Sequence, residues 1–275
     1  MKELFEVDCA KCVKCGLCVA DCAFGALRLD DLRSPVMAKP EACMKCQHCL
    51  AVCPTGAVTF DGTKPEECVP TEGLALPGFE EAVNWLRTRR SMRRFAKEDV
   101  DRGPLESILA ALANAPTGCN ARSLTFTCLS TRESMETFKR GFIKAIEDHR
   151  DGSKLRPRWL AVPAIRLRKG GSDMFFRDAP GMLVVSSDET NRAVTTPRED
   201  VAIACAHFEM LANAAGIATC WCGFLELVQR EVPELLERTL GIRRETPFYA
   251  MLFGKAAVRY RRGVRRDAYA KIVFV

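Results

Sequence analysis

The spacing of apolar residues predicts a regular series of helices and strands after residue 78. Phe79, Val83 and Leu86 recur on one face of a helix predicted over residues 78–90, and the next helix begins at Asp101. The remaining patterns predict, in chain order, a strand at 124–129, a helix at 130–149, a strand at 182–186, a helix at 197–216 and strands at 248–253 and 269–275.

Sequence signals mark the ends of two of these helices. Ser130 and Glu133 have the spacing of a capping box before the first, and Thr196 and Glu199 have it before the second, which ends at Gly216. Alanines are interspersed along the apolar stripe of the second helix. A helix of this kind is either the central core helix of a domain or one side of a close helix–helix interface, and both interpretations stay open.

The beginning of the chain is organised around cysteine instead. The spacing C-x2-C-x2-C-x3-C occurs twice, and a similar short stretch (AFGAL, then PTGAV) follows each copy. Short strands at Leu4–Val7 and Val58–Phe60 are expected to close round two small helices. Prolines and glycines then mark a linker. We therefore expect a domain at residues 1–62, a linker at 63–78 and a second domain at 79–275.

Two cysteine groups of this spacing are typical of a pair of [4Fe–4S] clusters. In each group three thiolates two residues apart wrap one cluster and the displaced fourth reaches the other, so the ligand sets interleave. Zinc sites usually pair two shorter hooks, and disulfides require an oxidising compartment that nothing in the sequence indicates. The stretch resembles bacterial two-cluster ferredoxins over about residues 3–62. The expected ligands are Cys12, Cys15, Cys18 and Cys53 for one cluster, and Cys43, Cys46, Cys49 and Cys22 for the other.

Two further cysteines lie near these groups. Cys9 extends the first run and is interpreted as a spare thiol; a ligand frame shifted to include it is less favoured, because only Cys22 follows its neighbour at the x3 spacing. Cys68 lies in the linker and has no assigned role.

Composition narrows the class of protein. Hydrophobic residues make up 48% and charged residues 28%, as in ordinary soluble proteins. The formal net charge of +6 does not predict a nucleic-acid partner, because eight ligand thiolates around two cluster cores remove about four positive charges. No apolar run suits export or reaches the ~20 residues of a membrane span. With fifteen cysteines, we expect a cytoplasmic protein without nucleic-acid or membrane partners.

Two polar motifs in the second domain suit an anionic cofactor. Residues 89–95 (RRSMRRF) place a hydroxyl among guanidinium groups, which match phosphate oxygens by bidentate hydrogen bonds; a solvated basic surface is the alternative. Residues 115–123 (APTGCNARS) form a polar turn that can hydrogen-bond the edge of a ring. A basic run at residues 255–266 follows the strand at 248–253.

In this order, the motifs resemble the nitroreductase family of FMN enzymes over about residues 79–267. Two further stretches agree: Asp178-Ala179-Pro180 before the strand at 182–186, and the helix ending at Gly216 followed by IATCWCGF. The resemblance implies an α+β fold, in which a small ferredoxin-like two-cluster domain precedes a nitroreductase-like domain with a mixed or antiparallel central sheet flanked by helices.

The resemblance also implies a homodimer with FMN at its interface. In the basic run at residues 255–266, Arg262 and Arg266 match the family's phosphate ligands best, with the register fixed only to within a position or two. The implied FMN-binding residues are Arg89, Arg90, Ser91 and Arg93; Pro116, Thr117 and Asn120 from the neighbouring subunit; the backbone at Cys222 and Gly223; and Arg262 and Arg266.

Fused to a ferredoxin domain, the resemblance implies an FMN-dependent oxidoreductase that reduces nitroaromatics or another small electron-poor acceptor. Its electrons would arrive through the clusters from ferredoxin or NAD(P)H, and the flavin rather than a side chain would carry the chemistry. One alternative is an electron-transfer or storage protein serving a partner enzyme; another is dehalogenating or flavin-cleaving chemistry. The basic stretch at residues 154–169 either covers the flavin or is a solvated loop.

Overall fold

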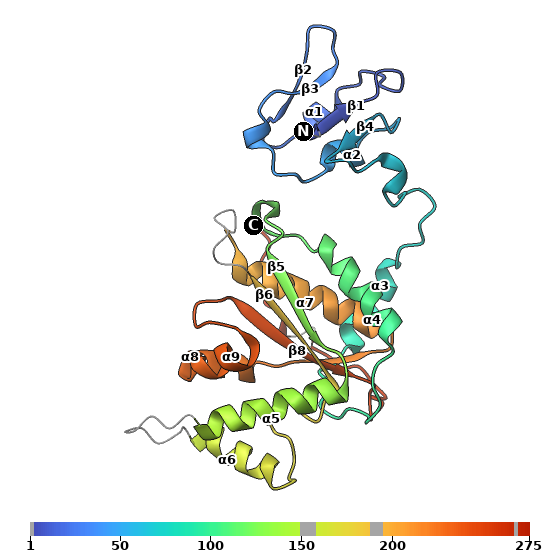
Figure 1. Cartoon of the computed structure of the whole chain (residues 1–275). Coiled ribbons are helices and arrows are strands. Elements are labelled where there is room, and N and C mark those ends of the chain that lie inside the picture. The colour runs from blue at the N-terminus through green and yellow to red at the C-terminus, as the bar shows by residue number, and fades with distance from the viewer. Residues whose placement is uncertain (1–2, 149–157, 188–194, 267–268) are drawn as a thin grey trace. The chain divides into compact units, whose positions relative to one another are not determined.

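The computed structural model describes residues 3–148, 158–187, 195–266 and 269–275 (Figure 1). The chain divides into two compact units, Met1–Pro77 and Gly78–Val275. The first unit therefore takes in most of the proline-rich stretch predicted as a linker. Among the described residues no helix combines the length and apolar character that a membrane crossing needs.

The first unit is built from two small antiparallel strand pairs and two single-turn helices. The pair β1–β4 confirms the two predicted strands, with β1 starting one residue later than expected, whereas the pair β2–β3 was not predicted. Phe5, Leu50, Val58 and Phe60 are buried between them. The elements are β1 (Phe5–Val7), α1 (Leu17–Ala20), β2 (Leu27–Leu29), β3 (Pro35–Met37), η1 (Pro40–Ala42), α2 (His48–Ala51), β4 (Val58–Phe60) and η2 (Pro65–Glu67).

The sequence repeat of the first unit is also a repeat of backbone conformation. Lys14 and Lys45, which occupy the same place in the two cysteine groups, have φ of 58° and 51°. Gly25 and Gly56, which follow the fourth cysteine of each group, have φ of 63° and 61°. These angles lie in the left-handed region, which is uncommon for a lysine. Both halves therefore fold as copies of one turn that wraps its cysteines.

The second unit is organised around a four-stranded antiparallel sheet with the strand order β5-β6-β8-β7. The predicted strands at 124–129, 182–186 and 248–253 are confirmed within one residue at each end. Its elements are α3 (Phe79–Thr88), α4 (Arg102–Ala111), η3 (Leu112–Asn114), η4 (Gly118–Asn120), β5 (Leu124–Leu129), α5 (Arg132–Asp148), α6 (Arg158–Arg168), β6 (Gly181–Ser187), α7 (Pro197–Ala214), β7 (Ala218–Trp221), α8 (Phe224–Glu231), α9 (Pro233–Leu240) and β8 (Phe248–Gly254).

Helices cover both faces of this sheet. Successive side chains of a strand point to opposite faces, and β6 is buried on both. Leu183 and Val185 belong to the core that contains Phe208 of α7, whereas Met182 and Val184 belong to the core built with α5, α8 and α9. The alanine-rich helix α7 is thus a central core helix on one side (Figure 1).

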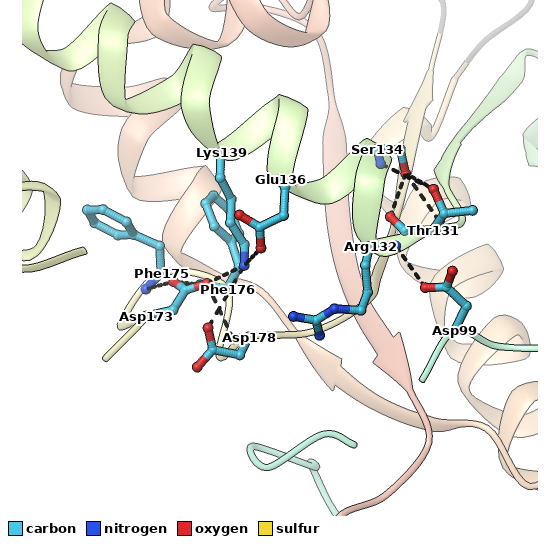
Figure 2. Close-up of polar contacts among 10 residues, drawn as sticks. All are labelled: Asp99, Thr131, Arg132, Ser134, Glu136, Lys139, Asp173, Phe175, Phe176 and Asp178. Atoms are coloured by element: carbon cyan, nitrogen blue, oxygen red, sulfur yellow. Dashed lines mark hydrogen bonds and ion pairs between the residues drawn. The ribbon is translucent and has the colours of Figure 1, made fainter. Parts of the chain in front are cut away.

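The two predicted capping boxes are wrong in detail. Helix α5 begins one residue later than the prediction required, so Thr131 takes the capping position and exchanges hydrogen bonds with Ser134: each backbone N–H donates to the other's hydroxyl oxygen at 3.1 Å (Figure 2). At α7 Thr196 is the N-cap residue, but its side chain makes no capping hydrogen bond. Its hydroxyl instead donates to Asp200 Oδ1 at 2.9 Å.

Other expectations also change. Residues 269–275 form no strand and are exposed, because no strand of the described part of the chain pairs with them. The expected apolar face of α3 is also exposed, with Phe79 at 80% and Leu86 at 64%. Of the basic stretch at 154–169, the part at Arg158–Arg168 is the helix α6 rather than a loop. Residues 154–157 and His149 lie outside the described residues.

Candidate cofactor sites

The eight cysteines of the repeat line two separate cavities in the first unit. The cysteines divide between the cavities as the interleaved ligand sets predict. Among the described residues no three histidine, cysteine, aspartate or glutamate side chains converge as they would around a single metal ion. The thiols instead surround spaces, as a larger cluster requires. One cavity is lined by Cys12, Cys15, Cys18 and Cys53, and the other by Cys22, Cys43, Cys46 and Cys49.

Burial disfavours the thiolate form of some of these cysteines in the absence of a metal. Burial raises the pKa of Cys49 to about 12 and also raises the pKa of Cys18. Burial acts in the same direction on Cys53, but hydrogen bonds from the Ala57 and Thr55 backbone and the Thr55 hydroxyl outweigh it and lower the pKa. Iron ions would turn the buried thiols into thiolates at neutral pH. The donor set therefore fits two iron–sulfur clusters.

In the second unit, the segment with the predicted phosphate-binding residues lies along β7. The Met92 N–H donates to the Thr219 carbonyl at 2.8 Å, which fixes the backbone next to Ser91. Arg89 Nη1 lies 3.1 Å from Oε1 of Glu209 in α7. Arg90 and Ser91 are partly exposed and Arg93 is exposed. The hydroxyl and guanidinium groups are thus gathered at one edge of the sheet.

The basic run after β8 lies alongside the segment that holds the predicted phosphate-binding residues. The Ala96 N–H donates to the Lys255 carbonyl at 2.8 Å, and the Ala257 N–H donates to the Arg94 carbonyl at 3.0 Å. Further on, a Cβ built at Gly263 would lie 2.9 Å from the carbonyl oxygen of Arg87. Arg262, beside that glycine, is therefore near the start of the phosphate-binding segment. Arg266 is exposed four residues beyond.

Cys222 and Gly223, directly after β7, are the backbone positions predicted to lie against the ring of FMN. The Cys222 N–H donates to the Ala250 carbonyl at 2.9 Å, and Gly223 begins helix α8. A Cβ at Gly223 would lie 3.0 Å from the Tyr249 hydroxyl, so glycine leaves more room at this edge than a larger residue would. Burial raises the pKa of Cys222 to about 12, which argues against a reactive thiolate there. Arginines, a serine hydroxyl and an open backbone edge along one strand fit the phosphate and ring of FMN.

The second predicted group of flavin residues lies elsewhere in the unit. The turn that holds Pro116, Thr117 and Asn120 is fixed to the first turn of α7, where the Gly118 N–H donates to Asp200 Oδ1 at 2.9 Å. A Cβ at Gly118 would overlap the hydroxyl of a threonine just before α7. Asn120 has a φ of 51°.

The two groups are separated along α7. Asp200 holds the second group and Glu209 contacts the first. Nine residues of α-helix span about 14 Å. The structure therefore brings together Arg89–Arg93 and the 222–223 edge, but within one chain it leaves the 116–120 turn at the other end of the helix.

A buried ion pair that no sequence motif indicated shapes a neighbouring turn (Figure 2). Lys139 of α5 has a side chain only 5% exposed, and its Nζ lies 3.0 Å from Asp173 Oδ2. Asp173 Oδ1 accepts the backbone N–H groups of Phe175 and Phe176 at 3.0 and 2.8 Å. Burial alone would lower the pKa of Lys139, but the attraction of Asp173 and Glu136 outweighs it and raises the pKa. In the sequence, this pair could have been detected from Lys139, a lysine at a position of α5 where helical spacing predicts an apolar residue.

This turn lies against the end of β7. The rings of Phe175 and Phe224 are 4.5 Å apart between centroids, and the Cys222 thiol points to the Phe175 carbonyl at 3.9 Å. Burial raises the pKa of Cys220 in β7, and the positive charges of Arg93 and Arg177 oppose that rise. Arg177 adds positive charge to this edge that sequence analysis did not assign.

Comparison with known proteins finds a match for each of the two units. The model of the nitroreductase family matches residues 86–255, and that of a 4Fe-4S dicluster domain matches residues 11–57. No curated protein matches the chain. Similar solved structures include a nitroreductase with bound FMN from Bacteroides fragilis, at 20% identity over 70% of this chain and 99% of that one, with a TM-score of 0.53. A nitroreductase with bound FMN from Desulfitobacterium hafniense is 23% identical over 70% of this chain and 97% of that one, with a TM-score of 0.50.

At these identities the structural likeness shows a shared fold, whereas the family match covers more than half of the chain. The second unit confirms the α+β class expected from the motifs. The chain belongs to the nitroreductase family and carries a 4Fe-4S dicluster domain ahead of the family's fold.

Proposed function

We propose that the protein is an FMN-dependent oxidoreductase that reduces nitroaromatic or similar electron-poor acceptors with electrons relayed through two [4Fe–4S] clusters. The observation that carries the proposal is that one chain holds two interleaved four-cysteine cavities and a basic segment bonded along β7. The family match and the FMN bound by both similar structures support the choice of flavin.

The chain's own residues bind and orient the cofactor. Arg89, Arg90 and Arg262 supply bidentate donors for the phosphate, and Ser91 supplies a hydroxyl for the ribityl chain. Arg93, whose positive charge acts on Cys220 of β7, would favour the negatively charged reduced form of a flavin bound along this strand. When bound, FMN supplies hydride transfer from its N5 and the ability to take up electrons from a one-electron donor.

The complete site is proposed to form between two copies of the chain. The turn at residues 116–120 and the segment at 89–93 contact α7 about 14 Å apart, too far to hold one edge of the same ring. Two α7 helices packed antiparallel would place the turn of one copy beside the segment of the other. Ala202, Ala206 and Met210, at every fourth position of α7, form an exposed stripe of the kind that close helix packing uses.

The covalent link between the two units supports a relay. A carrier on the same chain reaches its acceptor at a high effective concentration, without a separate docking step. The cluster domain is therefore proposed as the entrance for electrons from ferredoxin, with NAD(P)H as the other donor. We propose that the protein works in the reducing cytoplasm, where iron–sulfur clusters and free thiols would persist.

The test is an anaerobic reductive titration of the purified protein. The proposal predicts about eight irons and one FMN per chain, and bleaching of the cluster absorbance before that of the flavin when reduced ferredoxin is added. Direct flavin bleaching by NADH or NADPH would make the clusters an outlet or reservoir. A protein that holds no flavin after reconstitution would contradict the proposal.

A further inference from the structure

A buried glutamate to which the sequence motifs assigned no role lies beside the proposed phosphate site. Glu209, in the middle of α7, is 6% exposed. Burying a carboxylate is unfavourable unless it is paired and hydrogen-bonded. Here Oε1 lies 3.1 Å from Arg89 Nη1 and accepts the Thr219 hydroxyl at 3.3 Å. Asn213 Nδ2 in turn donates to the Thr219 hydroxyl oxygen at 3.2 Å.

This carboxylate connects three elements of the site. It lies on α7, its ion-pair partner Arg89 directly follows α3, and its hydrogen-bond partner Thr219 lies in β7. The Thr219 carbonyl also accepts the Met92 N–H at 2.8 Å. Both ends of the segment from Arg89 to Met92 are therefore tied to the pair formed by Glu209 and Thr219, and the residues between them, Arg90 and Ser91, are held in place.

The contact also sets the direction of the Arg89 side chain. A guanidinium is a planar group with five N–H donors in a rigid fork. Holding Nη1 on a buried acceptor restricts the positions that the other donors of the fork can take. The Arg89 side chain stays 23% exposed, whereas that of Glu209 is 8% exposed. The Arg89 guanidinium thus contacts the buried Glu209 carboxylate on one side and reaches the surface where the phosphate is proposed to bind on the other.

We propose that Glu209 is a positioning residue for FMN: it holds the Arg89 fork and the 89–92 backbone on β7 in the geometry that receives the phosphate. This inference rests on the proposed function and adds to it a residue that touches Arg89 rather than FMN. A glutamate that merely stabilised the packing of α7 would make the same contacts, but its loss would affect folding and not FMN affinity in particular.

The test measures FMN affinity of the full-length apoprotein, with FMN itself as the probe and its fluorescence quenching as the signal. Glu209→Ala is expected to raise the FMN Kd by about tenfold, equivalent to about 1.4 kcal/mol. Glu209→Gln, which keeps an acceptor at the same reach, is expected to restore most of the affinity. Glu237→Ala, at an exposed position of α9, is the matched control and should bind FMN as the wild type does.

A double-mutant cycle separates positioning from packing. In an Arg89→Lys background, which lacks the fork, Glu209→Ala is expected to cause a much smaller further loss of affinity. An equal loss in both backgrounds, or wild-type affinity in Glu209→Ala, would overturn the inference. Where Glu209→Ala does not fold, Thr219→Val removes the hydroxyl donor at nearly constant shape; it should weaken FMN binding, and unchanged affinity would overturn the inference. If the wild type itself binds no FMN, the proposed function fails instead.

Discussion

The buried ion pair between Lys139 and Asp173 makes a sharp prediction about the stability of the second unit. The two side chains are 5% and 0% exposed, and their charged atoms lie 3.0 Å apart. Removing one partner of such a pair leaves a buried charge uncompensated and typically costs 3–5 kcal/mol. Because backbone N–H groups still solvate Asp173, we expect Lys139→Met to lower the free energy of unfolding by about 3 kcal/mol.

The chain offers a convenient assay for this loss. All three tryptophans, Trp85, Trp159 and Trp221, belong to the second unit, so their fluorescence during urea unfolding of the full-length protein reports that unit alone. With an m-value of about 3 kcal/mol/M, the urea midpoint of Lys139→Met falls by about 1 M. Lys144→Met, at an exposed position of the same helix, is the control and should stay within about 0.5 kcal/mol of wild type.

The double variant Lys139→Met/Asp173→Asn tests the cause. Asparagine keeps an oxygen acceptor for the turn's backbone N–H groups but carries no charge. If the uncompensated charge causes the loss, the double variant is more stable than Lys139→Met alone. A midpoint like that of wild type in Lys139→Met, or a double variant less stable than the single one, would refute the reasoning.

Three further predictions follow from the site. Gly118→Ala should weaken FMN binding in a titration, because its Cβ would overlap a threonine before α7, whereas Gly103→Ala, with open space around its Cβ, should not; equal effects would contradict the proposed turn. At about pH 8, iodoacetamide should label the exposed Cys119 but not Cys222, because burial raises the pKa of Cys222 to about 12 and leaves it almost no thiolate; peptide mass spectrometry decides, and rapid labelling of Cys222 would show that the site is open. Ala206→Glu, on the exposed stripe of α7, should yield a monomer in sedimentation experiments; a dimer with wild-type FMN content would exclude this stripe as the interface.

The sequence predicted the parts of the molecule whose chemistry is local. Three cysteines of each set lie within a few residues of one another, and the known interleaving of such repeats assigns the fourth. The two predicted sets therefore coincide with the linings of the two cavities. The basic segment at residues 89–93 and the turn at 116–120 were also visible as motifs, because a phosphate or ring edge is bound by consecutive residues.

What the sequence did not reveal depends on distant partners or on exact helix ends. Arg89 and Glu209 are 120 residues apart, and no periodicity links them. The α5 cap was misplaced by one residue, since both Ser130 and Thr131 can cap a helix, and it is Thr131 that accepts the Ser134 N–H. Residues 269–275 are apolar enough for a strand, but a strand needs a partner, and the described sheet does not supply one.

The relay through the clusters is tested most directly by anaerobic turnover of a nitroaromatic acceptor with reduced ferredoxin as donor. The variant is Cys46→Ser, at a predicted ligand of the second cluster, and the control is Cys68→Ser, at an exposed cysteine outside both cavities. The account predicts that Cys46→Ser loses turnover while retaining FMN, and that Cys68→Ser turns over like the wild type. Unchanged turnover in Cys46→Ser, with its iron content reduced, would contradict the relay.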